Sequence, residues 1–182
     1  MIARSSPLKA VLLGIAVLPA ALLALGAHGQ QVQAATDVAA LAARIQVLED
    51  REAIRALILA YGAAHDHRDY RTFASLFATN GEWVGGLGSA KGPEAIFELM
   101  DSTIGHNPLP EGSGTYHVMT NERIAIEGDQ ASATTQWIYI TPSDDGAPRL
   151  VYLGHYDDQF VRENGEWKFL RREAPVDIPV GR

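Results

Sequence analysis

The sequence predicts an α+β fold, in which helices come first and an antiparallel sheet follows. Up to about residue 100, apolar side chains recur at three- and four-residue spacing, which is typical of helices. A segment rich in Gly, Pro, Ser and Asn follows at 102–114, and beyond it the apolar period becomes that of strands. Because 47% of the 182 residues are hydrophobic, the chain can bury one core well.

The N-terminal segment is typical of a secretory signal. Two basic residues precede an apolar run over 10–27, and a small-residue cleavage pattern ends at Ala34. We therefore expect a signal peptide over 1–34, a single mature domain over 35–182, and a periplasmic or secreted protein with no membrane contact after cleavage. The alternative is a retained membrane anchor, which Pro19 and the small residues after it disfavour.

Cysteine content and charge exclude several classes of protein. The chain has no cysteine, which rules out disulfides, thiol catalysis, thiolate-bound metals and a lipid-anchored lipoprotein. Loss of Arg4 and Lys9 with the signal changes the formal net charge from −7 to −9. An acidic domain repels phosphate backbones, so we expect no nucleic-acid partner and favour a neutral or weakly polar small molecule.

Three helices are expected between the signal and the loop. The first begins at Thr36 or Asp37, with a break or bend at Asp50. Asp69 caps a second, short helix, and Gly92-Pro93-Glu94 opens the third, because proline suits the first helical position. Their apolar faces comprise Val38, Leu41, Ile45 and Leu48, then Ile54, Leu57, Ile58 and Tyr61, then Phe73, Leu76 and Phe77, and finally Ile96, Phe97 and Met100.

Four strands are expected after the loop, at about 115–127, 131–141, 149–163 and 166–173. Turns at Gly128-Asp129 and Asn164-Gly165 and a loop at 142–148 separate them. A strand face that mixes aromatic rings with His, Asn and Asp is too polar for a plain core and too aromatic for plain surface, which predicts a pocket lining. Alternation assigns to such faces His117, Met119 and Asn121, then Thr135, Trp137 and Tyr139, and then Gly154, Tyr156, Asp158 and Phe160.

The segment from Tyr61 to Tyr70 is where chemistry is first expected. An apolar helical pattern runs there into His65-Asp66-His67, and burial of such groups is costly unless they are paired. Residues two apart do not share a helix face, so we expect no metal at these three residues. No cofactor is expected either. His106 in the loop is a further candidate, either as an exposed residue or as part of a lid over the site.

Six short motifs follow one another at a distinctive spacing. They are Leu48 through Ile54, Tyr61 through Asp69, Phe77-Ala78, His117 with Asn121, Gly154 with Tyr156 and Asp158, and Gly165 through Phe169. Together they resemble the SnoaL-like branch of the NTF2-like superfamily over most of residues 40–175. The resemblance implies a cone-shaped α+β barrel, in which a bent antiparallel sheet wraps around N-terminal helices and encloses an apolar pocket. It also implies a homodimer or higher homo-oligomer, formed through the outer face of the sheet.

Enzymes of this family include polyketide cyclases, scytalone dehydratase, ketosteroid isomerase and related cofactor-free lyases. In the dehydratase arrangement, Asp66 matches the aspartate that orients a catalytic histidine, and His117 matches that histidine. His65 and Gly85 fall where that enzyme has tyrosines. Gly154 and Tyr156 occupy the positions of its serine and asparagine, so the resemblance does not extend to its particular substrate.

An imidazole held by a carboxylate is a general base near neutral pH, which suits elimination, isomerisation and retro-aldol cleavage. We expect an enzyme acting on a small hydrophobic, oxygenated molecule of aromatic or polyketide-like type, or alternatively a non-catalytic ligand-binding or dimerisation module. His117, Asp66, Tyr61 and the tryptophans also have purely structural interpretations, as satisfied or core residues. The expected catalytic residues are Asp66, His117 and Tyr156, and the expected substrate-binding residues are Tyr61, His65, Trp83, Asn121, Trp137, Tyr139 and Asp158.

Overall fold

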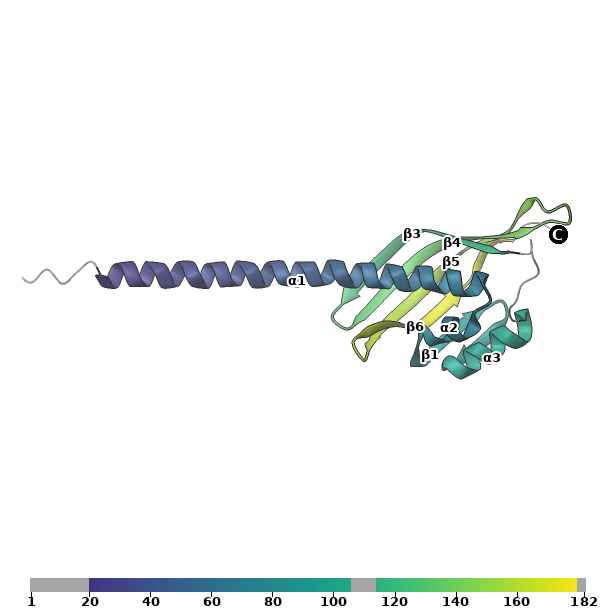
Figure 1. Cartoon of the computed structure of the whole chain (residues 1–182), viewed down its shortest axis with the longest axis horizontal. Helices are drawn as coiled ribbons and strands as arrows, with labels where there is room; N and C mark the ends of the chain where they lie inside the picture. The colour runs from purple at the N-terminus through teal and green to yellow at the C-terminus, as the bar shows by residue number, and fades with distance from the viewer. Residues whose placement is uncertain (1–19, 106–113, 180–182) are drawn as a thin grey trace, which may run out of the picture. The chain divides into compact units, whose positions relative to one another are not determined.

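The computed structural model describes residues 20–105 and 114–179, with side chains for 36–105 and 114–178 (Figure 1). Residues 1–19 of the expected signal and His106 of the expected lid loop lie outside the described residues. The helices are α1 (Ala20–Asp66), α2 (Tyr70–Ser75) and α3 (Pro93–Ile104). The strands are β1 (Phe77–Gly85), β2 (Gly88–Lys91), β3 (Tyr116–Glu127), β4 (Gln130–Pro142), β5 (Pro148–Glu163), β6 (Glu166–Ala174) and β7 (Val176–Pro179).

Contacts divide the chain into two units, residues 1–44 and 45–182. In the first unit the described side chains of α1 are exposed, Val38 and Leu41 among them. The second unit contains the rest of α1 and every other element. Among the helices in the described part of the chain, none combines the length and the apolar character that a membrane crossing needs.

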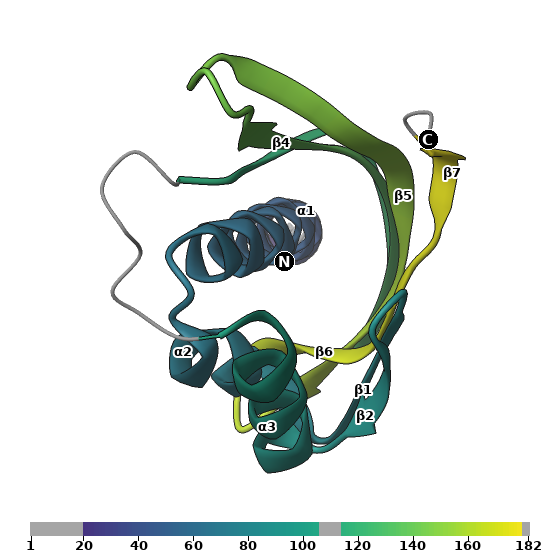
Figure 2. The ribbon, with the colours of Figure 1, turned by 90° about the vertical axis from the view of Figure 1, so that its right-hand side faces the viewer.

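The strands form one curved sheet in the order β2-β1-β6-β5-β4-β3, and β7 pairs with β5. Neighbouring strands are antiparallel except β1 and β6, which run parallel. Figure 2 shows the sheet bending around the second half of α1, with α2 and α3 on the same side. The predicted α+β class and the bent, mainly antiparallel sheet are therefore confirmed, and the sheet remains open rather than closing on itself.

The core lies between the inner face of the sheet and the helices. Along α1, Ile54, Ile58 and Tyr61 are almost fully buried, as the helical spacing predicts. They pack in one cluster with aromatic residues of α2 and the strands, including Phe73, Phe160 and Phe169. Full burial of one such side chain contributes about 1.5–3 kcal/mol, so this cluster is the main source of stability for the second unit.

The first helix differs from the prediction in two ways. It continues through Thr36 and Asp37 instead of beginning there, and it does not break at Asp50. The Asp50 carboxylate is buried and accepts hydrogen bonds from Arg162 at 2.6 Å and Trp167 at 3.1 Å, so a polar residue is satisfied inside the helix. The third helix is confirmed, since a proline opens α3. The second is confirmed at its start, where the Asp69 side chain caps α2 by accepting from Thr72 N, but it ends at Ser75, and Phe77, which was expected on its apolar face, begins β1.

Alternation in β4 and β5 is confirmed, but in β3 it fails at Asn121. The β3–β4 register shifts between Thr120 and Arg123, and Asn121 has a φ of 56°. This bulge turns Asn121 to the outer face, where its side chain is exposed and donates to Gln136 Oε1 at 2.6 Å. The expectation that Asn121 lies beside His117 is therefore wrong.

Candidate active site

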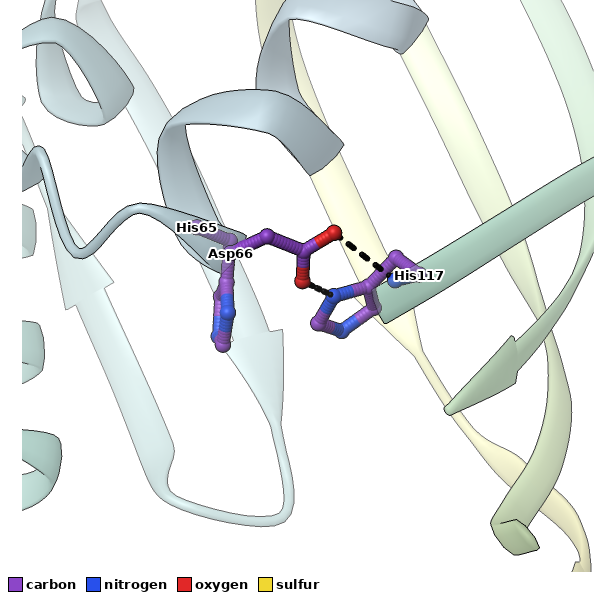
Figure 3. A group of neighbouring side chains, drawn as sticks. All are labelled: His65, Asp66 and His117. Atoms are coloured by element: carbon purple, nitrogen blue, oxygen red, sulfur yellow. Dashed lines mark hydrogen bonds and ion pairs between the residues drawn. The ribbon is translucent and has the colours of Figure 1, made fainter. Parts of the chain in front are cut away.

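Asp66 and His117 form a tightly bonded pair where the end of α1 meets the start of β3. Asp66 Oδ1 and His117 Nδ1 are 2.6 Å apart, and Asp66 Oδ2 accepts the backbone N–H of His117 at 2.8 Å (Figure 3). The side chains are only 15% and 8% exposed, respectively. Because an ionised carboxylate only accepts hydrogen bonds, we assign the proton to Nδ1, which leaves a lone pair on His117 Nε2.

Local sequence explains why these two residues meet. The chain turns sharply after α1, with Arg68 at a φ of 52° and the N–H of Asp69 bonded to the carbonyl of Ala64 at 2.8 Å. One turn before Asp66, the Met119 side chain of β3 packs against the backbone of Gly62: a Cβ there would lie 2.8 Å from Met119 Cε, the end of a flexible side chain, and at an ordinary contact distance of 3.7 Å from His117 Cβ. The helix and the start of β3 are therefore in direct contact at this point.

His65 lies beside the pair, with its ring centroid 4.5 Å from that of His117 (Figure 3). Burial lowers the pKa of His65 to about 3, and the neighbouring charge of His117 adds to this effect. The ring is therefore neutral at physiological pH. Its Nδ1 is buried and has no hydrogen-bond partner among the described residues, and the same holds for Tyr70 Oη.

Tyr139 and Trp137 approach the pair from β4. The Tyr139 ring centroid is 4.7 Å and the Trp137 centroid 6.4 Å from that of His117. Burial raises the pKa of Tyr139, so its hydroxyl stays protonated and can donate a hydrogen bond. Trp137 donates its own N–H to the carbonyl of His155 at 2.9 Å, so this tryptophan contributes ring surface to the site.

A second cluster of polar side chains surrounds Arg172 in the interior of the fold. Its guanidinium makes two hydrogen bonds of 2.7 Å to Asp158, and both side chains are fully buried. It also lies 4.0 Å from the ring centroids of both Tyr61 and Tyr156. Burial acts to lower the pKa of Arg172, but attraction to Asp158 outweighs it and raises the pKa. Arg172 is therefore a fixed positive charge inside the fold, and its Nη1 has no partner among the described residues.

Apart from Asn121, which lies exposed on the outer face, the expected site residues fall into two adjoining groups. The first group contains the Asp66–His117 pair and the rings beside it, which belong to His65, Tyr139 and Trp137. Around Arg172 the structure places Tyr61, Trp83, Tyr156 and Asp158, with Trp83 donating to Tyr61 Oη at 2.9 Å. The groups touch where Trp137 stacks on Tyr156, with ring centroids 5.6 Å apart.

Asp158 and Tyr156, both expected in the site, are held in the buried environment of Arg172. Both oxygens of Asp158 are bonded to Arg172, so a ligand would meet the guanidinium rather than this carboxylate. Burial raises the pKa of Tyr156 well above its usual value, so the phenol is neutral. Its catalytic role stays a prediction, as does the apolar pocket.

Sequence reasoning missed Arg172 itself. The signal was indirect: an inward-facing Asp158 requires a buried cation as partner. The register shift between Gln159 and Phe160 changes the alternation along β6, so both Phe169 and Arg172 are fully buried.

His65, Asp66 and His117 also form a potential metal-binding set, since each offers a ligand atom within 4.8 Å of the others. His67, which follows Asp66 in the sequence, is not part of this set: its Nδ1 lies 2.7 Å from the carbonyl of Ala63. Two imidazoles and a carboxylate suit Zn²⁺, although an ion bound to all three would compete with the Asp66–His117 hydrogen bond. The absence of a metal stays a prediction.

Comparison with known proteins identifies the class to which this fold and site belong. Residues 46–173 match the model of the SnoaL-like domain, and the chain is therefore a member of the SnoaL-like family. A solved NTF2-like protein with a cystatin-like fold from Novosphingobium aromaticivorans is 30% identical, with a TM-score of 0.67 over 75% of this chain and 88% of that one.

Two further relatives are informative. The gamma-hexachlorocyclohexane dehydrochlorinase of Sphingobium indicum is 26% identical over 129 residues, which are 70% of this chain and 80% of the relative. The crystal structure of LinA, at 24% identity, covers 75% of this chain and 92% of its own with a TM-score of 0.63, and thus shows the same fold. The family and fold that the sequence motifs imply are confirmed.

Proposed function

We propose that this protein is a cofactor-independent lyase, in which His117 removes a proton from a carbon atom of a small hydrophobic molecule. The observation that carries the proposal is the 2.6 Å contact between Asp66 Oδ1 and His117 Nδ1 in a largely buried setting. The carboxylate fixes the orientation of the ring and stabilises the imidazolium that forms when Nε2 accepts a proton.

The reaction that fits this arrangement is an elimination. His117 Nε2 takes the proton, the electrons of the broken C–H bond form a double bond to the adjacent carbon, and the leaving group departs from that carbon with its bonding pair. Tyr139 can donate a hydrogen bond to an atom that gains negative charge. The positive charge of Arg172, deeper in the fold, favours the same charge development.

Two observations support this reaction class. The name of the Sphingobium relative describes the removal of hydrogen and chlorine, which is an elimination. The rings of Tyr61, Trp137, Tyr139 and Tyr156 form an aromatic surround that suits an apolar ligand. At 26% identity the substrate of the relative is not assigned to this protein. We propose a substrate class instead, a hydrophobic, oxygenated ring compound.

A solvent-exchange assay tests the proposal. Wild type, His117→Ala and the control His67→Ala are incubated in deuterated buffer with aromatic and polyketide-like hydroxy compounds and with chlorinated cyclohexanes, and mass spectrometry follows deuterium uptake and product. We expect turnover or exchange in wild type and control, and a loss of about 10²- to 10⁴-fold in His117→Ala with the circular dichroism spectrum unchanged. Binding in all three proteins, with no exchange or turnover in any of them, would instead indicate a ligand carrier.

A further inference from the structure

Two buried polar atoms lack a partner, one on His65 beside His117 and one on the neighbouring Tyr70. Of the side-chain atoms in the described part of the chain, His65 Nδ1 and Tyr70 Oη are among the few that are buried without a hydrogen bond. Their rings are neighbours, with centroids 5.9 Å apart and planes at 84°. Tyr70 is only 2% exposed, so bulk water does not solvate its hydroxyl.

Unpaired buried polar groups are rare in folded proteins, because removing them from water is costly. Two of them side by side therefore call for a shared explanation. Both belong to residues that flank the turn between α1 and α2, and the His65 ring lies 4.5 Å from the His117 ring. A ligand bound at His117 would therefore lie beside the His65 ring, which is itself next to the Tyr70 ring.

The charge state of these groups indicates which ligand atom fits. Burial lowers the pKa of His65 to about 3 and raises the pKa of Tyr70, so both side chains are neutral across the physiological range. The tyrosine hydroxyl can donate, and the neutral imidazole offers one donor and one acceptor. An uncharged oxygen matches this pair, whereas a hydrocarbon carbon or a chlorine atom leaves both groups unpaired.

We propose that His65 and Tyr70 form a subsite that binds an uncharged hydroxyl or carbonyl oxygen of the substrate, next to the carbon from which His117 removes a proton. This inference rests on the proposed function and deepens it, since it assigns the place where an oxygen of the substrate binds. It also names two residues through which an oxygenated ligand is preferred over a halogenated or purely hydrocarbon one of the same shape.

The test compares two ligands of matched shape, 2-naphthol and 2-methylnaphthalene, in fluorescence titrations. Binding is measured with wild type, Tyr70→Phe and His65→Leu. We expect wild type to bind 2-naphthol about tenfold more tightly than 2-methylnaphthalene, and the two variants to lose most of that preference. Tyr116→Phe, at a residue 65% exposed, and His67→Leu, at an exposed histidine, are the matched controls and should keep it.

A spectroscopic readout separates binding from a structural role. In protein labelled with ¹⁵N-histidine, saturation with 2-naphthol should shift the ring nitrogens of His65 more than 2-methylnaphthalene does. No detectable binding of 2-naphthol, equal affinity for the two ligands in wild type, or an undiminished preference in Tyr70→Phe and His65→Leu would each overturn the subsite. The last two results would indicate that a buried water satisfies these atoms instead.

Failure of the subsite and failure of the proposed function give different results. If exchange depends on His117 while wild type shows no ligand preference, the lyase proposal stands and the subsite is wrong. If the preference and its loss in the variants are observed but no compound undergoes exchange, the subsite stands and the protein is a carrier of oxygenated molecules.

Discussion

At the scale of single residues, Asp66 holds His117 by two different atoms, the ring Nδ1 and the backbone N–H. The carboxylate therefore orients the imidazole and also fixes the first residues of β3. An amide in its place would keep one acceptor oxygen but would lose the negative charge that stabilises an imidazolium.

We accordingly expect Asp66→Asn to lower solvent exchange by about 10²-fold or more, with a larger effect on kcat than on KM. The rate is measured by the deuterium assay on the compound that wild type turns over. Because the backbone bond to His117 can survive in the amide, the thermal midpoint should change little. Equal rates in wild type and Asp66→Asn would contradict the assigned role.

His65 predicts a distinct pH dependence of stability. The unfolded residue titrates near 6.5 and the folded one at about 3, so between these values only the unfolded state binds the proton. Titration of His65 therefore leaves the free energy of unfolding unchanged above pH 6.5. Below that pH it lowers the free energy of unfolding, by at most about 1.4 kcal/mol per pH unit.

Urea unfolding of wild type and His65→Leu between pH 7 and 5 measures this contribution. The slope of free energy against pH should be smaller in the variant, and His67→Leu should leave it unchanged. His155 has the opposite effect on the pH dependence of stability. Its hydrogen bond to Asp177 raises its pKa, so its contribution to the free energy of unfolding is lost as the pH rises. A variant slope equal to that of wild type would show that His65 titrates normally in the folded protein.

The site residues also show where sequence reasoning succeeds and where it fails. Asp66 and His117 were predictable because a helix-end carboxylate and a strand histidine belong to an ordered set of motifs. Asn121 was misplaced because a bulge reverses alternation, and no local residue pattern announces that bulge. Arg172 was missed because its partner Asp158 lies on a different strand, and their pairing depends on the β5–β6 register.

At the scale of elements, Asp50 joins α1 to the β5–β6 hairpin. Burial acts to raise the pKa of Asp50, but hydrogen bonds from Arg162, Trp167 and Gln46 outweigh it and lower the pKa. Asp50→Asn keeps an oxygen for Trp167 but loses the charge that faces Arg162. We expect a loss of about 1–3 kcal/mol, or about 2–4 °C in Tm for each kcal/mol. Calorimetry on this variant and on Glu49→Gln, an exposed neighbour, measures the effect, which should be absent in the control.

The buried pair of β5 and β6 allows a sharper experiment. Arg172→Met leaves Asp158 as an unpaired buried charge, so we expect a loss of about 3–5 kcal/mol. The double variant Arg172→Met with Asp158→Leu removes both charges and should recover much of that loss in urea unfolding. A double variant as unstable as the single one would show that packing against Tyr61 and Tyr156, rather than charge, gives Arg172 its structural importance.

Three strands escaped prediction for a related physical reason. β2 has four residues without apolar alternation, and β7 is equally short. β1 contains Thr79, Asn80 and Gly81, and its register with β6 shifts within this stretch. Each of these strands forms because it pairs with another strand, and the local pattern of apolar residues does not predict such pairing. The long strands β3 to β6 alternate over most of their length, with interruptions at Asn121 in β3 and between Phe169 and Arg172 in β6, and their ends agree with the prediction to within one residue.

At the scale of the whole molecule, every residue assigned to the site lies within the unit that spans 45–182. The homo-oligomer implied by the family stays a prediction, and light scattering should give a mass of at least two chains. Tyr116, Val118 and Ile178 expose apolar surface on the strands and are the natural positions for charged substitutions that would lower this mass.

The N-terminal segment makes a testable prediction about export. The charge and apolar pattern of the first residues predicts cleavage after Ala34. N-terminal sequencing of protein recovered from the periplasm or medium should therefore begin near Ala35. Because the Asp66–His117 pair and the rings around it belong to the unit that spans 45–182, a chain that starts at Ala35 should match the full chain in thermal midpoint and in exchange rate. An uncut N-terminus on membrane-associated protein would instead identify the segment as a retained anchor, and loss of exchange in the shortened chain would show that the site depends on residues before Ala35.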